Sequence, residues 1–280
     1  MANQIDLLNV RVDRVDFAAA MEHVRRAIQL RRPRQIVTVN VDFIKLAKAD
    51  SAYRRLINTA DLSVADGMPL LWAARLIGAP LPERITGTDL VLGCAQMAAL
   101  EGHRLFLLGA APGVAEQAAT ELQRRFPGLT VCGIYAPPFG PWAEDEDRRI
   151  VERVQAARPD VLFVAFGAPR QDVWIREHMA ELNVPVSIGI GGTLNFLAGK
   201  IRRAPQWMQD FGLEWLYRVV QEPGRLWKRY LLEDLPIFFQ LLAQARVTPN
   251  EALTEEAPAF SHRFAITADA TPVSVELTPR

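Results

Sequence analysis

The stretch Val161-Leu-Phe-Val-Ala-Phe-Gly-Ala-Pro-Arg-Gln171 decides how this chain is expected to fold. Its first six residues form a continuous apolar run, which is typical of a strand buried on both faces of a parallel sheet. The run stops at Gly167, and a proline and the polar residues Arg170 and Gln171 follow. Open α/β sheets bind ligands where strands end and helices begin, so Gly167, Arg170 and Gln171 are candidates to hold an anionic ligand.

Similar apolar runs recur along the chain and alternate with amphipathic helical patterns. Strands are expected at Ile5–Val10, Gln35–Asn40, Asp61–Ala65, Arg104–Gly109, Thr130–Ile134, Asp160–Gly167 and Val184–Gly189. Helices are expected at Phe17–Leu30, Met68–Ile77, Asp89–Leu100, Gly113–Phe126, Ala143–Ala157 and Arg170–Glu181. This alternation predicts an α/β fold with a mostly parallel, doubly wound sheet flanked by helices.

Composition excludes several classes of protein. The 280 residues carry 32 basic and 32 acidic side chains, which argues against a nucleic-acid binder with a global basic field. Two cysteines without C-x-x-C spacing and four scattered histidines indicate no metal site. Because the N-terminus does not resemble a signal peptide and no run reaches ~18 to 20 apolar residues, a cytoplasmic protein is expected, soluble or at most peripheral to a membrane.

The character of the chain changes after Gly199. Residues 200–246 hold eight lysines and arginines, five acids and three tryptophans, which favours a helix at a membrane interface or a helical hairpin packed on the sheet or on a second subunit. We therefore expect three parts: an α/β domain at 1–203, a basic, aromatic helical appendage at 204–246, and an acidic, proline-rich mobile tail at 247–280.

Polar residues follow several of the expected strands. Asp66, before Gly67, is a candidate general base, although an N-cap for the next helix explains it equally simply and is favoured by the residues alone. Thr38, Asn40 and Asp42 end another strand and are suited either to contact a ligand or to satisfy loop backbone.

Three further turns admit two interpretations each. Arg84, followed by Thr86-Gly-Thr88, suits a phosphate site or a capping box. Gly109 lies in a strand–loop–helix joint that suits a phosphate or nucleoside but is also common in α/β proteins generally. Ile188–Asn195 is glycine-rich, but Leu194 stands where a G-x-G-x-x-G motif needs glycine, so close backbone approach to a ligand is expected and a dinucleotide is not.

Asp145-Glu-Asp147 has the D-x-D form found at metal sites of some sugar transferases. It opens an amphipathic helix, where acids suit the helix dipole. We interpret it as a solvated helix start.

These motifs, in this order, resemble the WecG/TagA/CpsF family of bacterial glycosyltransferases, glycosyltransferase family 26. The resemblance covers roughly residues 5–240. Its residues are Thr38-Val-Asn40, Ala65-Asp-Gly67, Glu83-Arg84, Gly87-Thr-Asp89, Leu108-Gly109, Gly167-Ala-Pro-Arg-Gln171 with Trp174, Gly189-Ile-Gly-Gly-Thr193, Arg203-Ala-Pro205 with Trp207, Gly212-Leu-Glu-Trp-Leu-Tyr-Arg218, and Glu222-Pro223 with Arg225.

The resemblance implies a Rossmann-like fold and inverting, metal-independent transfer from a UDP-sugar to a polyprenyl-diphosphate-linked saccharide at the inner face of the cell membrane. The donor sugar would be N-acetylmannosamine, its uronic acid or glucose. No cofactor and no nucleic-acid partner are expected. The resemblance also allows a homo-oligomer.

The resemblance also assigns roles to residues. It makes Asp66 the base, which reverses the preference for a cap, and it associates the appendage with membrane docking and completion of the site. The expected catalytic residues are Asp66, Thr38 and Arg84. The expected substrate-binding residues are Asn40, Gly67, Gly109, Gly167, Arg170, Gln171, Gly191, Gly192, Thr193, Arg218 and Arg225.

The chain departs from the family pattern at two positions, where Asp172 replaces a glutamate and Asn195 replaces an aspartate. Two other functions compete with the transferase: a non-catalytic nucleotide-binding or scaffold protein, and a dinucleotide-dependent oxidoreductase, which the glycine spacing disfavours.

Overall fold

The computed structural model describes residues 4–138, 140, 142–202, 204–205, 208, 213–221 and 223–247. The expected tail, apart from Val247, lies outside these residues.

The core of the molecule is a six-stranded sheet in which every neighbouring pair of strands is parallel. The strand order is β4-β3-β8-β7-β5-β6. The strands are β3 (Arg34–Val39), β4 (Leu62–Ala65), β5 (Arg104–Gly109), β6 (Thr130–Tyr135), β7 (Val161–Ala165) and β8 (Val186–Gly189). The expected α/β fold with a mostly parallel sheet is confirmed.

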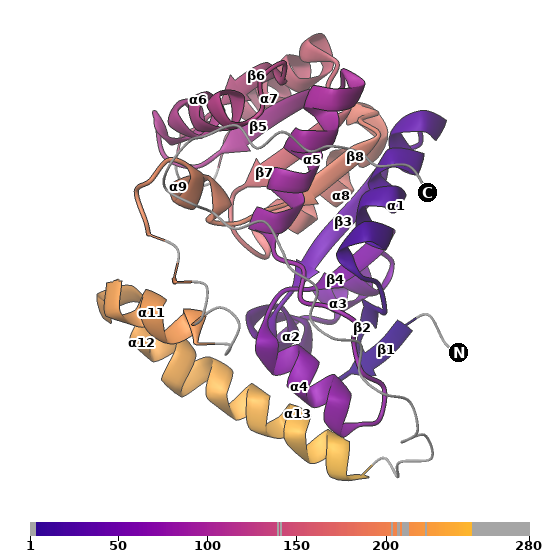
Figure 1. Cartoon of the computed structure of the whole chain (residues 1–280), viewed down its shortest axis with the longest axis vertical. Helices are drawn as coiled ribbons and strands as arrows, with labels where there is room; N and C mark the ends of the chain where they lie inside the picture. The colour runs from indigo at the N-terminus through magenta and orange to yellow at the C-terminus, as the bar shows by residue number, and fades with distance from the viewer. Residues whose placement is uncertain are drawn as a thin grey trace, which may run out of the picture.

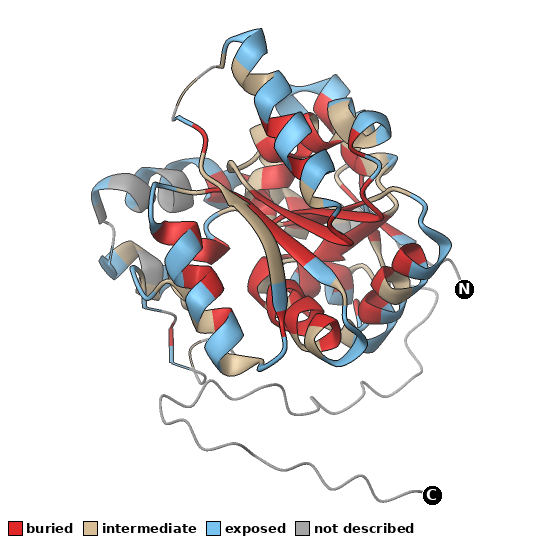
Figure 2. Cartoon of the chain, turned by 90° about the horizontal axis from the view of Figure 1, so that it is seen from above, coloured by how far each residue is buried: buried red, intermediate tan, exposed pale blue. Residues whose placement is uncertain are grey.

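Helices cover both faces of this sheet (Figure 1). Alternation along β5 sorts its side chains, since Leu105 and Leu107 join one buried cluster while Phe106 and Leu108 join another. The first face is covered by α1 (Phe17–Leu30), α5 (Gly87–Glu101) and α6 (Val114–Arg125). The second is covered by α2 (Val41–Ala49), α3 (Ser51–Asn58), α4 (Met68–Leu76), α7 (Glu144–Ala157) and α8 (Arg170–Leu182). Figure 2 shows the buried strands enclosed by helices whose outer turns are exposed.

The expected strand at Ile5–Val10 is wrong. The chain instead forms a separate antiparallel hairpin of β1 (Gln4–Leu7) and β2 (Val10–Asp13). Leu8 and Asn9 between them have φ of 54° and 66°. Two consecutive residues with positive φ make the tight turn that joins twisted antiparallel strands, and the apolar Leu8 in the first of these positions hides that turn in the sequence.

Two short helices that were not predicted lie between β3 and β4. Asn40 caps α2 by accepting a hydrogen bond from the backbone N–H of Phe43 at 3.2 Å. Asp50 caps α3 through the N–H of Ala52 at 2.7 Å. Helices of eight or nine residues carry little periodicity of their own, so these capping residues were their clearest signal.

Helices also follow the sheet at the C-terminal side: α11 (Glu214–Gln221), α12 (Pro223–Lys228), the π-helical η1 (Arg229–Asp234) and α13 (Leu235–Val247). We call these four elements the appendage. Ile237 and Leu241 of α13 are buried in the same apolar cluster as α2, α4 and the N-terminal hairpin. Within the part of the chain that the structure describes, no helix is both long and apolar enough to cross a membrane.

Candidate active site

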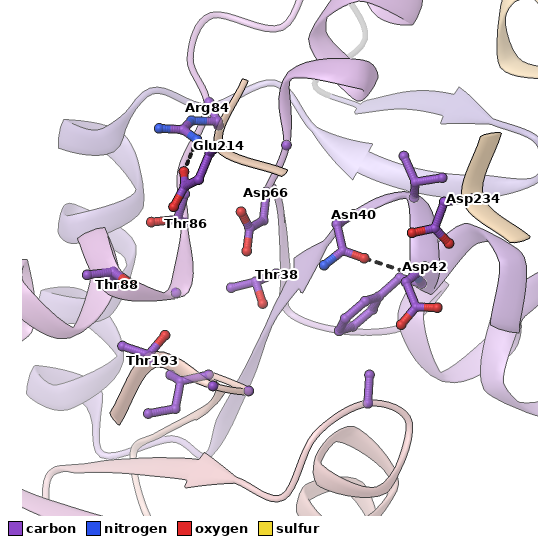
Figure 3. Close-up of a pocket in the computed structure, with 18 of the residues that line it drawn as sticks. Thr38, Asn40, Asp42, Asp66, Arg84, Thr86, Thr88, Thr193, Glu214 and Asp234 are labelled. Atoms are coloured by element: carbon purple, nitrogen blue, oxygen red, sulfur yellow. Dashed lines mark hydrogen bonds and ion pairs between the residues drawn. The ribbon is translucent and has the colours of Figure 1, made fainter. Parts of the chain in front are cut away.

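A cavity of about 600 Å³ lies at the carboxyl ends of β3, β4, β7 and β8 (Figure 3). It sits at the point where β3 and β8 are neighbours in the sheet although most of the chain separates them, which is the usual ligand position in open α/β sheets. The predicted residues that line it are Thr38, Asn40, Asp66, Gly67, Arg84, Gly167, Gln171, Gly191, Gly192 and Thr193.

Thr38 and Asn40 reach the cavity from the end of β3. The Thr38 hydroxyl is buried and donates to the carbonyl oxygen of Gly189 at 3.3 Å, which ties β3 to β8. The side-chain oxygen of Asn40 caps α2, and its amide nitrogen points into the cavity (Figure 3). The capping bond satisfies loop backbone, which is one of the two roles that the position of Asn40 suggested.

Asp66 is not the N-cap of α4, so that interpretation is wrong. The cap position is taken by Gly67, which has φ of 147° and makes no side-chain cap bond. The Asp66 backbone N–H donates to the carbonyl of Val39 at 2.7 Å, and its carboxylate points into the cavity (Figure 3). Since the glycine makes the turn, the carboxylate is held at the strand end without belonging to the helix.

Arg84 is a buried cation beside this carboxylate. Its side chain pairs with Glu214 of α11 at 2.9 Å, and both side chains are largely shielded from solvent. Burial acts to lower the pKa of Arg84, but Glu214, together with Asp66 and Asp89, holds the pKa above its ordinary value. The guanidinium is therefore fully charged, and Asp66 is close enough to interact with it electrostatically.

The start of α5 forms another wall of the cavity. Thr86 and Asp89 make a reciprocal capping box, as the capping interpretation of this turn predicts, with bonds of 3.2 Å and 2.9 Å. Gly87 and Thr88, in the first turn, line the cavity. A Cβ on Gly87 would lie 3.1 Å from the Thr193 hydroxyl, so the helix start approaches the loop after β8 closely.

A buried network of polar side chains supports the loop after β8. The Gln171 side-chain oxygen accepts the Gly191 N–H at 2.9 Å. Beside Gln171, the fully buried Asp172 accepts the Tyr53 hydroxyl of α3 at 2.9 Å. A Cβ on Gly189 would come within 2.6 Å of both the Gln171 amide and the Asp172 carboxyl, so only glycine fits there.

Burial raises the pKa of Asp172 to about 7, and the hydrogen bonds from Tyr53 and Gln171 only partly oppose it. An acid that is neutral at this depth avoids the cost of an isolated buried charge. Asp172 does not line the cavity; it supports Gln171, which does.

Four predicted residues do not contribute a described side chain to the cavity. Gly109 lies at the far side of β7, where a Cβ would be 2.8 Å from the Ala165 carbonyl. Arg170 places its guanidinium 3.6 Å from the ring centre of Trp142. The side chains of Arg218 and Arg225 lie outside the described residues.

The appendage contributes cavity residues that were not predicted. Glu214, Asp234, Leu235 and Phe238 all line the cavity. The last three recur at the i, i+1, i+4 spacing of one helical face, a signal that was present in the sequence. Lys45 reaches this wall, with its ammonium 2.7 Å from Asp42, 2.6 Å from Glu233 and 3.8 Å from Asp234.

The acids of the D-x-D motif lie elsewhere, in the first turn of α7. Asp147 accepts the Trp174 indole N–H at 2.7 Å and lies 3.0 Å from His178. Across the described ranges, no three His, Cys, Asp or Glu side chains are grouped so as to hold a metal ion.

Comparison with known proteins agrees with a sugar-transferring enzyme built on this sheet. Residues 5–251 match the model of the Glycosyl transferase WecG/TagA/CpsF family. The chain is also 33% identical over 246 residues to N-acetylglucosaminyldiphosphoundecaprenol N-acetyl-beta-D-mannosaminyltransferases of Staphylococcus aureus strains MW2 and MRSA252. Each alignment covers 87% of this chain and 93% of the relative. The chain is therefore a glycosyltransferase, and it belongs to the WecG/TagA/CpsF family.

Proposed function

We propose that this enzyme transfers an N-acetylmannosamine-type sugar from a UDP donor to a saccharide carried on a polyprenyl diphosphate, with inversion and without a metal ion. The activity named for the Staphylococcus aureus relatives supports the sugar and the lipid-linked acceptor. The cavity at the sheet switch point supports a nucleotide ligand. The product would enter a bacterial cell-surface polysaccharide.

The observation that carries the proposal is the Asp66 carboxylate, which points into the cavity beside the buried Arg84 cation. Asp66 takes the proton from the acceptor hydroxyl as its oxygen forms a bond to the anomeric carbon of the donor. The bond from that carbon to the UDP oxygen breaks, and the electron pair leaves with UDP. One displacement of this kind inverts the anomeric centre.

Negative charge that develops on the departing diphosphate needs positive partners. Arg84 supplies a full charge, and the amino end of the fifteen-residue helix α5 supplies its dipole through Gly87 and Thr88. The loop Gly191–Thr193, fixed by Gln171, adds backbone contacts. In this proposal Thr38 and Asn40 orient the sugar from the end of β3.

The appendage gives the proposed enzyme a route to its lipid-linked substrate. Its exposed apolar side chains include Leu216, Val220, Trp227, Leu232 and Phe239. Exposed apolar and aromatic groups on a basic segment suit peripheral association with the inner face of the cell membrane. Association of two copies through this surface is the alternative outcome.

The experiment is to measure UDP release from a panel of UDP-sugars, with a synthetic polyprenyl-diphosphate-linked N-acetylglucosamine as acceptor, in the presence of EDTA. We expect turnover with UDP-N-acetylmannosamine that survives chelation and disappears in Asp66→Asn. Asp145→Asn, an exposed aspartate of α7, is the matched control and should retain activity. If a folded protein releases no UDP from any donor of the panel and also fails to bind UDP, the proposal is overturned in favour of a scaffold.

A further inference from the structure

The cavity has two ends of opposite chemical character. Its inner end carries Asp66, Arg84 and Thr86, whereas its outer rim is built from apolar side chains of α4 and α13. On this rim the rings of Trp72 and Phe238 meet edge to face, with centres 6.1 Å apart. A purely polar substrate would make no favourable contacts with such an apolar rim.

The apolar rim is open to solvent. Trp72 is 38% exposed and Leu235 is 40% exposed, although both line the cavity. The same two helices continue outward with exposed Leu76 and Phe239. Contiguous exposed apolar surface of this kind marks a binding site more often than it occurs by chance.

We propose that the groove between α4 and α13, lined by Met68, Trp72, Leu235 and Phe238, binds the first isoprenoid units of the acceptor's lipid. We call it the lipid groove. The inference rests on the proposed function, because it places the sugar hydroxyl of the acceptor at Asp66. From there the acceptor continues through its diphosphate to a hydrocarbon chain, which has to leave the cavity over an apolar surface.

The wall between the two ends is acidic and only partly neutralised. Asp42 and Asp234 line the cavity there, but the Lys45 ammonium lies 2.7 Å from the first and 3.8 Å from the second. The same ammonium also lies 2.6 Å from Glu233, so the charges of the carboxylates are compensated only in part.

A bilayer or a second copy of the chain would use this surface differently. A flat partner would contact Leu76 and Phe239 on the outside, whereas Met68 and Phe238 face the cavity itself. A flexible hydrocarbon chain attached to the reacting sugar can reach both. The position of the aromatic pair inside the cavity rim therefore favours the substrate's own lipid.

Two measurements in detergent-free solution test the groove. The first is calorimetric binding of geranyl diphosphate against methyl diphosphate, which needs no turnover. The second is the KM of N-acetylglucosaminyl diphosphates that carry the same two groups. Burial of the equivalent of about two methylene groups predicts that the geranyl compounds bind about tenfold more tightly in both measurements.

The variants Trp72→Ser and Phe238→Ser should each remove most of this preference, while UDP binding reports that they remain folded. Leu76→Ser, on the outer surface of α4, is the matched control and should keep the preference. A wild-type protein without the preference, or rim variants that keep it and lose only vesicle binding or self-association, would overturn the lipid groove. Preferential geranyl binding without transfer to any acceptor would instead sink the proposed function and leave the groove standing.

Discussion

The two walls of the cavity are built in different ways. On the sheet side, backbone hydrogen bonds hold the working residues, as when the Asp66 N–H donates to the Val39 carbonyl at 2.7 Å. On the appendage side, side chains make the attachment: Glu214 pairs with Arg84, Glu233 pairs with Lys45, and Leu241 inserts into a core cluster. The first wall is fixed by the ladder of the sheet, whereas the contacts described for the second wall are made by side chains.

This difference indicates which wall suits catalysis and which suits entry of the acceptor. Catalytic groups need to be held to a fraction of an ångström, which a parallel ladder achieves at low cost. A large lipid-linked acceptor needs a wall that can yield as it enters, and local opening is easiest where few buried contacts hold an element. We therefore expect changes on the sheet wall to impair the chemical step and changes on the appendage wall to impair access and docking.

The largest effect should come from Asp66→Asn. Loss of a general base lowers kcat by about 10² to 10⁴-fold, and the thermal midpoint should stay close to that of the wild type because Asn has nearly the same shape as Asp. Steady-state UDP release and thermal melting measure both quantities. Retention of kcat within a few-fold would break the assignment of chemistry to the sheet wall.

A pair of variants across the two walls should give the next largest effect. Arg84→Gln removes the cation that faces the departing diphosphate and should lower kcat by about 10² to 10³-fold. Glu214→Gln leaves that cation in place and should change kcat by less than about tenfold, with the KM for the acceptor rising more than kcat falls. Equal losses in both variants would show that α11 takes part in the chemistry.

Two buried side chains compare the walls in stability. Ile188→Ala, in β8, should lower the global free energy of unfolding by about 2 to 5 kcal/mol, as core truncations do. Leu241→Ala, in α13, is equally buried but should mainly lower the free energy of local opening of that helix. Denaturant titration reports the first quantity, and hydrogen exchange of α13 amides reports the second. The contrast between the walls is refuted if Leu241→Ala shifts the global midpoint as far as Ile188→Ala.

The smallest effect concerns the support beneath the sheet wall. The folded-state pKa of Asp172 is raised to about 7, so between about pH 4 and pH 7 the folded protein binds a proton that the unfolded chain has released. This group therefore contributes stability at low pH that is lost as the pH rises towards 7. Asp172→Asn should remove that part of the pH dependence. Urea unfolding of both proteins from pH 4.5 to pH 7.5 tests it; parallel curves would show that Asp172 does not titrate there.

Local patterns in the sequence were sufficient for much of the fold and for the sheet wall. Apolar runs that end in glycine or polar residues predicted the strand ends that bring Thr38, Asp66 and Gly167 to one cavity. The same reasoning could not find the turn inside Ile5–Val10, because Leu8 is apolar and does not look like a turn residue.

Other features depend on distances that no local pattern encodes. Glu214 meets Arg84 across 130 positions of the chain, and Tyr53 meets Asp172 across 119. The direction of Arg170 was likewise set by tertiary packing. Its position at the start of α8 was predicted, but its guanidinium lies over Trp142 and not in the cavity.

The packing of α13 has a consequence for how the chain is made. This helix covers an apolar surface formed by α2, α4 and the N-terminal hairpin, and Gln244 accepts the Leu8 N–H at 2.9 Å. About 170 residues of chain separate the end of α4 from the end of α13. At the usual rate of translation, this surface stays exposed for on the order of ten to thirty seconds before α13 has been synthesised. During that time it can contact chaperones and other nascent chains. Helix α13, which is synthesised long after this surface, thus closes the part of the fold that began first.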